Sequence, residues 1–263
     1  MSTSQYAVGY SIRNEDDYAL VQLGPALDEA AALGVDCVEL ALYAMELVAN
    51  GRVLPDRLKR VKALTAELGG VHYVAHAGCI EPGNTEEVDT LFKRQREALA
   101  EVADFAASHG IVIVVENLFG GAHEAVLPSR LAEEVAAIGH PAVRACLDFS
   151  HAFLLSEKRG ANFLEEAAAL APLAKHLHLH DSFGKTTRIR ARHRAEQLAY
   201  GVGDLHLPLG LGSIPWDDLM ERCRFPAGVI FINELAPHYW SDLPEVVERT
   251  RALAKTAKIG AAA

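Results

Sequence analysis

Histidines alternate with leucines in the segment Lys-His-Leu-His-Leu-His-Asp-Ser, residues 175–182. A β-strand directs successive side chains to opposite faces, so His176, His178 and His180 are expected on one face and the leucines on the other. Such a strand suits a closed parallel barrel, where one face packs under helices and the other points into the lumen. A single histidine of this kind is usually a core or surface residue. Three in one register, followed by Asp-Ser, favour a strand that carries metal ligands.

Acidic or imidazole side chains also stand at the ends of four other apolar runs. The carboxyl ends of parallel strands meet at one rim of a barrel, where active sites are assembled. Carboxylates buried there without partners are unfavourable, so a divalent cation is the expected compensation. Salt bridges to Lys or Arg are the alternative, but no Lys or Arg follows directly on these runs. The four residues are His76, Glu116, Asp148 and Glu234.

Three carboxylates and the His178 imidazole, without a thiolate, form a hard to intermediate donor set. Such a set suits Mn, Mg, Co, Zn or Fe(II), and the residues leave the choice among these metals open. His151 lies three residues after Asp148, where a strand that turns into a helix could bring both side chains to one site. Asp204 and His206 form a second Asp/His pair, directly before a Gly-x-Gly loop.

The composition is that of an ordinary globular protein. The 263 residues are 50% hydrophobic and 23% charged, and we expect one domain over residues 1–263. The N-terminus lacks a basic start followed by an apolar run, and no apolar stretch nears the roughly 18 residues that span a bilayer. A cytoplasmic protein without membrane contact is therefore expected. The net charge of -10 argues against a broad electrostatic grip on nucleic acid, and four widely spaced cysteines without a CxxC pair are expected to be reduced.

Strand and helix patterns alternate along the whole chain, with glycines after helices and a proline at one helix start. This alternation implies right-handed crossovers and a parallel sheet, so the expected fold class is α/β. Residues 183–203 are expected to form an irregular excursion. The expected strands are residues 7–12, 36–42, 71–75, 111–115, 143–147, 175–182 and 228–233, and the expected helices are residues 27–33, 55–68, 85–108, 130–138 and 243–257, with one more beginning near residue 216.

Together these motifs resemble the xylose isomerase-like superfamily of TIM barrels, which includes the sugar phosphate isomerase/epimerase-like proteins and the AP endonuclease family 2 with endonuclease IV. The string Asp-x-His-Leu-Pro-x-Gly-x-Gly-x-Ile-x-Trp is the most specific of them. The resemblance implies an eight-stranded (β/α) barrel in which Glu116, Asp148, His178 and Glu234 bind the metal. The matching segments are residues 115–117, 147–151, 176–182, 204–216 and 233–234.

The sequence departs from the family pattern in one respect. Seven strands can be read where the family has eight, and a strand-helix unit is expected to be missing between His76 and Glu116. This leaves His76 as the clear histidine of that half of the barrel, so a one-metal site or a two-metal site fits better than a three-metal cluster. By the resemblance, His151 and His206 correspond to positions that bind substrate in the epimerases or extra metal in the endonucleases. The residues considered for a second metal or for substrate are His76, His151, Asp204 and His206.

The first functional hypothesis is a divalent-metal-dependent isomerase or epimerase acting on a sugar, a sugar phosphate or a related hydroxy-carbonyl compound. The metal would bind a carbonyl and the adjacent hydroxyl and stabilise the enediolate that forms when a proton leaves the neighbouring carbon. Glu116 and Glu234, on separate strands, could exchange protons with the substrate from two sides.

The second hypothesis is an endonuclease IV-like metal-dependent phosphodiesterase, and a third is a barrel that binds without catalysis. A basic segment after the histidine strand could hold a phosphate or carboxylate of a small substrate, or be a solvated face. The expected substrate contacts are His180, Lys185 and Arg188. An anionic small molecule is favoured over nucleic acid because of the acidic net charge, and a homodimer through an aromatic loop such as residues 239–240 is a further hypothesis.

Overall fold

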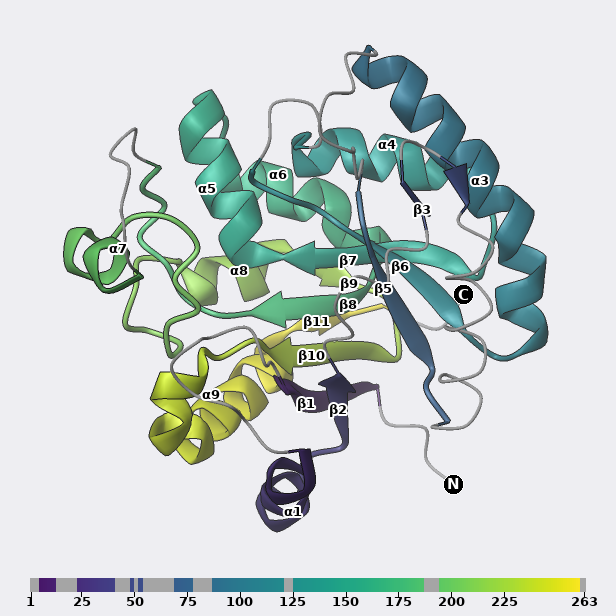
Figure 1. Ribbon diagram of the computed structural model, residues 1–263. Coiled ribbons are helices and arrows are strands. Elements are labelled where there is room, and N and C mark those ends of the chain that lie inside the picture. Colours follow the sequence, from purple (N-terminus) through teal and green to yellow (C-terminus); the bar gives the residue numbers. More distant parts are fainter. Residues whose placement is uncertain are drawn as a thin grey trace.

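A curled sheet of parallel strands forms the centre of the protein, in the order β2-β1-β10-β8-β7-β6-β5 (Figure 1). The computed structural model describes residues 5–12, 23–40, 48–49, 52–53, 69–77, 87–120, 125–186 and 194–260. The seven strands of the sheet are β1 (Tyr6–Ile12), β2 (Cys37–Leu40), β5 (His72–His76), β6 (Val112–Glu116), β7 (Val143–Asp148), β8 (Ala174–Leu179) and β10 (Val229–Asn233).

All seven expected strands are confirmed, and each lies within a few residues of its expected position. The two faces of β8 also divide as expected, because Leu177 and Leu179 join the hydrophobic core while the histidines point to the inside of the curl. Four short strands form two small ribbons outside the main sheet. They are β3 (Val48–Ala49) with β4 (Arg52–Val53), and β9 (Arg224–Phe225) with β11 (Lys258–Ile259).

The sheet is not closed within the described residues, because its edge strands β2 and β5 do not pair with one another. The described residues supply seven strands to this sheet, in agreement with the seven that the sequence predicts where the family has eight. β5 and β6 are direct neighbours in continuous register, from His72 opposite Val112 to His76 opposite Glu116, so the sheet has no gap between His76 and Glu116. Between Leu40 and His72, the described residues 48–49, 52–53 and 69–71 add no strand to this sheet.

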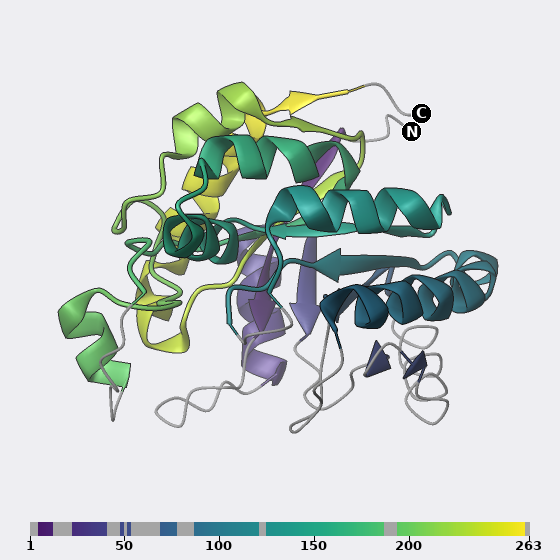
Figure 2. The ribbon, with the colours of Figure 1, turned by 90° about the horizontal axis from the view of Figure 1, so that it is seen from above.

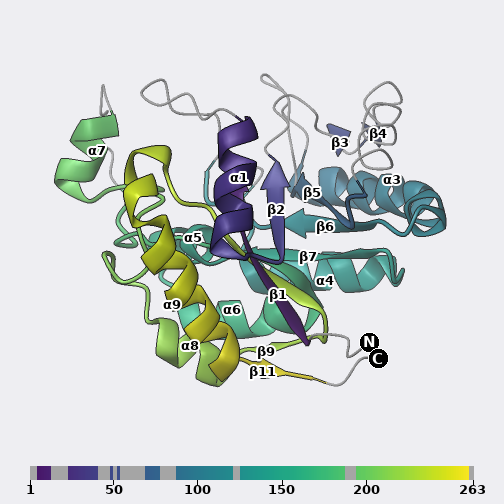
Figure 3. The ribbon, with the colours of Figure 1, turned by 90° about the horizontal axis from the view of Figure 1, so that it is seen from below.

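Helices cover the outer face of the sheet. Figure 2 shows α3 and α4 side by side over the strands, and Figure 3 shows α9 next to α1, where the Arg251 guanidinium of α9 donates to the Leu33 carbonyl. The helices are α1 (Leu23–Leu33), α3 (Val88–Ser108), α4 (Pro128–Ile138), α5 (Phe149–Arg159), α6 (Phe163–Leu170), α7 (Arg194–Tyr200), α8 (Trp216–Arg222) and α9 (Leu243–Thr256), with 3₁₀ turns η1 (Ala171–Leu173) and η2 (Pro237–Asp242).

Local sequence explains where several helices begin and end. Pro128 opens α4, where its missing N–H costs nothing, and Gly139 closes it in the left-handed conformation with φ of 65°. Asn162 caps α6 by accepting hydrogen bonds from the first-turn N–H groups. The expected helices at residues 27–33, 85–108, 130–138 and 243–257 are thereby found with small shifts of their ends, while residues 55–68 lie outside the described residues.

Residues 183–203 and the cysteines can also be compared with the sequence-based predictions. The supposed irregular excursion at residues 183–203 contains a short helix, α7, so that expectation was wrong in part. Cys37, Cys146 and Cys223 are free thiols, as expected, and Cys79 lies outside the described residues. Among the helices that the structure describes, none combines the length and apolar character that crossing a bilayer requires.

Candidate metal centre

Four neighbouring strands bring the predicted ligands to one rim of the sheet. β10, β8, β7 and β6 lie side by side, and Asp148 is directly opposite His178 in the register of β7 and β8. Glu116 is the last residue of β6, and Glu234 directly follows β10, where its N–H donates to the Leu179 carbonyl. The parallel register therefore places all four side chains at the carboxyl end of the sheet.

The imidazole of His178 lies at the centre of these residues. Its Nδ1 is 3.4 Å from Glu116 Oε1, 3.5 Å from Glu234 Oε2 and 3.7 Å from Asp148 Oδ2. We call Glu116, Asp148, His178 and Glu234 the His178 cluster. Its carboxylate residues are almost completely buried, with exposed fractions of 3%, 0% and 8% for Glu116, Asp148 and Glu234.

Members of the His178 cluster belong to groups that could hold a metal ion: Glu116 and Asp148 with His151, and His178 and Glu234 with Glu39. In tetrahedral sites with bonds of about 2.0–2.2 Å, ligand atoms lie about 3.3–3.6 Å apart, close to the separations around His178 Nδ1. That nitrogen is buried and makes no hydrogen bond of normal geometry to a described residue. The described ion-pair partners of Glu116 and Asp148 are all imidazoles, so no Lys or Arg of the described chain neutralises these two carboxylates.

Asp148 is fixed by the turn from β7 into α5. Its Oδ1 accepts the N–H of His151 at 2.7 Å and so caps α5, which leaves Oδ2 for the cluster. The side-chain amide of Asn117 accepts the N–H of Asp148 and donates to its carbonyl, both at 2.9 Å. These contacts join the ends of β6 and β7, and they explain why Asn117 follows Glu116 at this rim.

A second polar group surrounds Asp204 on the far side of Asp148. Asp204 Oδ2 lies 2.7 Å from His206 Nε2 and 3.3 Å from His151 Nε2, and Oδ1 lies 3.4 Å from His180 Nδ1. The Ser150 hydroxyl donates to Oδ1 at 2.9 Å. We call Asp204, His151, His180 and His206 the Asp204 cluster.

His206 adopts a backbone conformation that is uncommon for a residue with a side chain, with φ of 48°. Its Nδ1 lies 2.7 Å from the Glu234 carbonyl oxygen, and its own carbonyl accepts the N–H of Ala236 at 3.1 Å. Its ring stacks on the ring of His180, with centroids 3.9 Å apart and planes inclined by 15°. Strained backbone of this kind concentrates at functional sites, where surrounding contacts maintain it.

In both clusters, carboxylates and imidazoles stabilise one another's charged forms. Burial opposes ionisation of Glu116, yet the imidazoles of His178 and His151 outweigh it and hold the pKa of this carboxyl below its usual range. Burial likewise opposes protonation of His178, but Cys146 and the surrounding carboxylates raise the pKa of its imidazole. The pKa of Asp204 lies below its usual range because His206 and its neighbouring imidazoles overcome the effect of burial.

Comparison with known proteins agrees with this geometry. A family model described as xylose isomerase-like TIM barrel matches residues 29–256. The chain belongs to this family. No curated protein sequence matches it.

Several solved structures resemble this xylose isomerase-like chain in fold. An IOLI protein with a bound zinc atom has a TM-score of 0.68 at 14% identity, with 94% of this chain and 96% of that chain covered. A D-tagatose 3-epimerase-like protein has 0.63 at 18% identity, with coverage of 94% and 99%. The 3-keto-D-glucoside 4-epimerase YcjR from E. coli has 0.61 at 13% identity, again with 94% and 99%. At these identities the likeness establishes the fold.

Four further site residues are predicted from the sequence: His76, His180, Lys185 and Arg188. His76 is half exposed, and its Nε2 is 3.5 Å from Glu116 Oε2. His180 lies between the clusters, with Nε2 3.1 Å from Asp148 Oδ2. Lys185 is exposed, its ammonium lies 5.7 Å from the Phe183 ring centroid, and it contacts neither cluster among the described residues. Arg188 lies outside the described residues, so its role stays a prediction.

Sequence reasoning missed two carboxylates of this barrel. The first is Glu39 of β2, whose Oε2 lies 3.0 Å from His176 Nε2 and 3.1 Å from His178 Nε2. A signal was present, because Glu39 is a charged residue within a predicted strand and shares the face of Cys37.

The second is Asp181, which organises the loop that carries the Asp204 cluster. Its side chain accepts hydrogen bonds from the N–H groups of Gly210 and Ile214 and from the Trp216 indole. A Cβ at Gly212 would overlap Asp181 Oδ1, so only glycine fits there. These contacts explain the Gly-x-Gly-x-Ile-x-Trp part of the family string.

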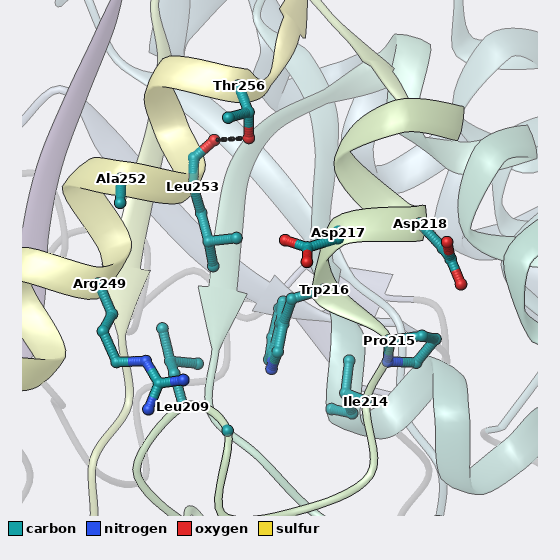
Figure 4. A pocket seen from close by; sticks show the side chains of 11 residues that line it. Leu209, Ile214, Pro215, Trp216, Asp217, Asp218, Arg249, Ala252, Leu253 and Thr256 are labelled. Carbon is teal, nitrogen blue, oxygen red and sulfur yellow. Dashed lines mark hydrogen bonds between the residues drawn. The ribbon is translucent and has the colours of Figure 1, made fainter.

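A separate pocket lies in the outer helical layer between α8 and α9, with a volume of about 590 Å³ (Figure 4). Trp216 and Asp217 of α8 line one side, and Arg249 and Leu253 of α9 line the other. No member of the two clusters lines it. Three of its lining residues, Gly210, Ile214 and Trp216, donate hydrogen bonds to Asp181.

Proposed function

We propose that this chain is a divalent-metal-dependent isomerase or epimerase acting on a sugar, a sugar phosphate or a related hydroxy-carbonyl compound. One observation carries the proposal: three buried carboxylates from three strands face the same nitrogen of His178 at 3.4–3.7 Å. The printed names of two fold neighbours, a D-tagatose 3-epimerase-like protein and a 3-keto-D-glucoside 4-epimerase, support an epimerisation. In the second name the inverted carbon is next to the keto carbon.

The proposed ligands of the cation are Glu116, Asp148, His178 and Glu234. A bound divalent cation would supply a Lewis acid that polarises a carbonyl and stabilises negative charge on the neighbouring oxygens. A zinc atom in one fold neighbour supports a metal here, and the donor set is also compatible with Mn, Mg, Co or Fe.

Glu116 and Glu234 are the proposed proton-transfer residues. Two strands, β7 and β8, separate β6 from β10, so the two carboxylates approach the rim from different sides. One carboxylate oxygen would accept the proton from the carbon next to the carbonyl, and the other glutamate would return a proton to the opposite face of that carbon. Burial of both residues keeps bulk water from competing for these protons.

Substrate contacts are proposed from the groups around this rim. His151, His180 and His206 are the proposed partners of substrate hydroxyls. Their ring nitrogens contact Asp204 on one side and the Asn117 carbonyl, Asp148 and the Glu234 carbonyl on the other, so a substrate hydroxyl would replace one of these contacts. Lys185 and Arg188 stay the proposed contacts for an anionic group on the substrate.

Solvent exchange tests the proposed function directly. The protein is stripped with a chelator and reloaded separately with Mn²⁺, Co²⁺, Zn²⁺ and Mg²⁺. Each form is incubated in D₂O with a panel of ketoses and keto-glycosides and followed by ¹H NMR. We expect metal-dependent deuterium incorporation at a carbon next to the carbonyl, together with the epimer. Full metal occupancy without exchange on any member of the panel would contradict the proposal.

A metal-dependent phosphodiesterase is the second candidate. The observation that favours it is the Asp204 cluster, whose one carboxylate and three imidazoles could hold a further metal beside the His178 cluster. The test is incision of a duplex that carries one abasic site. Incision that is abolished by chelation and restored by metal would place the hydrolase ahead of the epimerase.

A further inference from the structure

Glu39 of β2 contacts two histidines of β8, His176 and His178. It is the third residue of β2, and the side chain is 18% exposed. Its Oε2 is hydrogen-bonded to His178 Nε2 at 3.1 Å, and His176 Nε2 lies 3.0 Å from the same oxygen without the geometry of a hydrogen bond. His178 thus contacts carboxylates through both ring nitrogens, with Nδ1 toward the rim and Nε2 toward Glu39.

The contacts of Glu39 determine where the proton of His178 lies. An ionised carboxylate has no proton and can only accept hydrogen bonds, so in the contact with Glu39 the proton lies on His178 Nε2. A neutral imidazole that carries its proton on Nε2 has its lone pair on Nδ1, the nitrogen that faces Glu116, Asp148 and Glu234.

We propose that Glu39 is a positioning residue that holds the His178 proton on Nε2 and so directs the Nδ1 lone pair at the cation. This inference rests on the proposed function, because it concerns the same cation. Ligand histidines in metal sites regularly donate their second N–H to a carboxylate, which fixes the tautomer and the ring orientation. Here the carboxylate comes from β2, a strand that supplies no ligand to the His178 cluster.

Glu39 also has a second connection that must be separated from the first. His176 Nδ1 lies 3.1 Å from His72 Nδ1, and His72 is on β5, the other edge strand of the sheet. The chain of contacts Glu39–His176–His72 therefore bridges β2 and β5, which do not pair through their backbones within the described residues. A substitution of Glu39 can weaken this bridge as well as the metal site.

Three variants separate the two connections: Glu39→Gln, Glu39→Ala and His72→Phe. Divalent metal affinity is measured for Zn²⁺ and Co²⁺ by competition with a chromophoric chelator, and thermal unfolding is recorded on the metal-free proteins. We expect Glu39→Ala to weaken metal binding about 10- to 100-fold. Glu39→Gln keeps an acceptor oxygen and should recover part of this loss. His72→Phe breaks only the bridge, so it should lower the unfolding temperature and leave metal affinity within about 2-fold.

The tautomer of His178 can be measured directly in the wild-type protein. In ¹⁵N-histidine-labelled, zinc-loaded protein, His178 should carry its proton on Nε2 and show Nδ1 as the metal-bound nitrogen. A zinc-loaded His178 protonated on Nδ1, or a Glu39→Ala protein with wild-type metal affinity, would overturn the inference. A loss in Glu39→Gln as large as in Glu116→Gln would also overturn it, since Glu39 would then be a direct ligand.

These results separate the inference from the function on which it rests. If the wild-type protein binds no divalent metal, the proposed function fails. If the wild-type protein binds metal and catalyses exchange while the Glu39 variants bind equally well, only the role of Glu39 is refuted.

Discussion

The two polar clusters at the rim of the sheet are opposites in composition. In the His178 cluster three carboxylates surround one imidazole, whereas in the Asp204 cluster three imidazoles surround one carboxylate. The first contains more carboxylates than imidazoles, and His76, His151 and His180 from outside it also contact its carboxylates. The second balances its carboxylate with its own imidazoles and a hydroxyl. We therefore expect an added cation to stabilise the His178 cluster more than the Asp204 cluster.

Glu116→Gln should have the largest effect, because this residue is proposed both to bind the cation and to transfer a proton. Loss of a general base alone costs about 10²- to 10⁴-fold in rate, and we expect a loss at the upper end of this range. The measurement is the initial rate of deuterium incorporation at saturating metal. Glu245→Gln, at an exposed position on α9, is the matched control and should retain the wild-type rate. A Glu116→Gln protein within 10-fold of wild type would contradict this role.

Removal of the metal should come next in size. A cation bound at 100 times its dissociation constant stabilises the folded state by about 2.7 kcal/mol, so chelation should lower the unfolding temperature by several degrees. Calorimetry of the loaded and stripped proteins checks this. In Asp148→Asn the difference between loaded and stripped protein should nearly vanish, since the variant lacks the carboxylate charge opposite His178. An unchanged unfolding temperature at full metal occupancy would contradict a stabilising role of the cation.

Asp204→Asn tests the Asp204 cluster, which we expect to be stable without a metal. The change removes the carboxylate that three buried imidazoles share, and we expect a loss of about 1–3 kcal/mol in the free energy of unfolding. Affinity of the His178 cluster for metal should change less than 10-fold. Chemical denaturation and chelator competition measure the two quantities, with the exposed Asp218→Asn as control. A collapse of metal affinity in Asp204→Asn would show that the two clusters form one site.

Lowering the pH should have the smallest of these effects, and it should act on metal affinity. The neighbouring carboxylates raise the pKa of His178, so its imidazole is protonated in the metal-free protein and the cation must displace that proton. Below the raised pKa, metal affinity should fall about 10-fold for each unit that the pH falls, and above it the affinity should level off. Titration calorimetry in buffers of different ionisation heat should show release of about one proton. Affinity that stays constant across this range would contradict protonation of His178.

Local periodicity explains how much of this arrangement the sequence predicts. The two-residue period of β8 separates His178 from Leu177, and the apolar runs before Glu116 and Asp148 define where their strands end. Such signals lie within one strand, so neighbouring residues suffice to reveal them. The clustering of the strand ends follows from parallel topology alone.

The features that the sequence did not predict depend on contacts between distant segments. Glu39 contacts His178 across 139 positions, and the role of Asp181 becomes visible only when the loop with Gly210 and Gly212 folds over it. The strand order, with β2 and β5 as the edges of the sheet in the described part of the chain, likewise depends on which strands become neighbours, which no local period encodes.

Anomalous diffraction at the metal edge, on crystals of the protein loaded with zinc or manganese, tests the central claim most directly. We expect a peak about 2.0–2.3 Å from His178 Nδ1, with oxygens of Glu116, Asp148 and Glu234 in the same coordination shell. Loaded crystals with the anomalous peak elsewhere, or with none near His178, would contradict it.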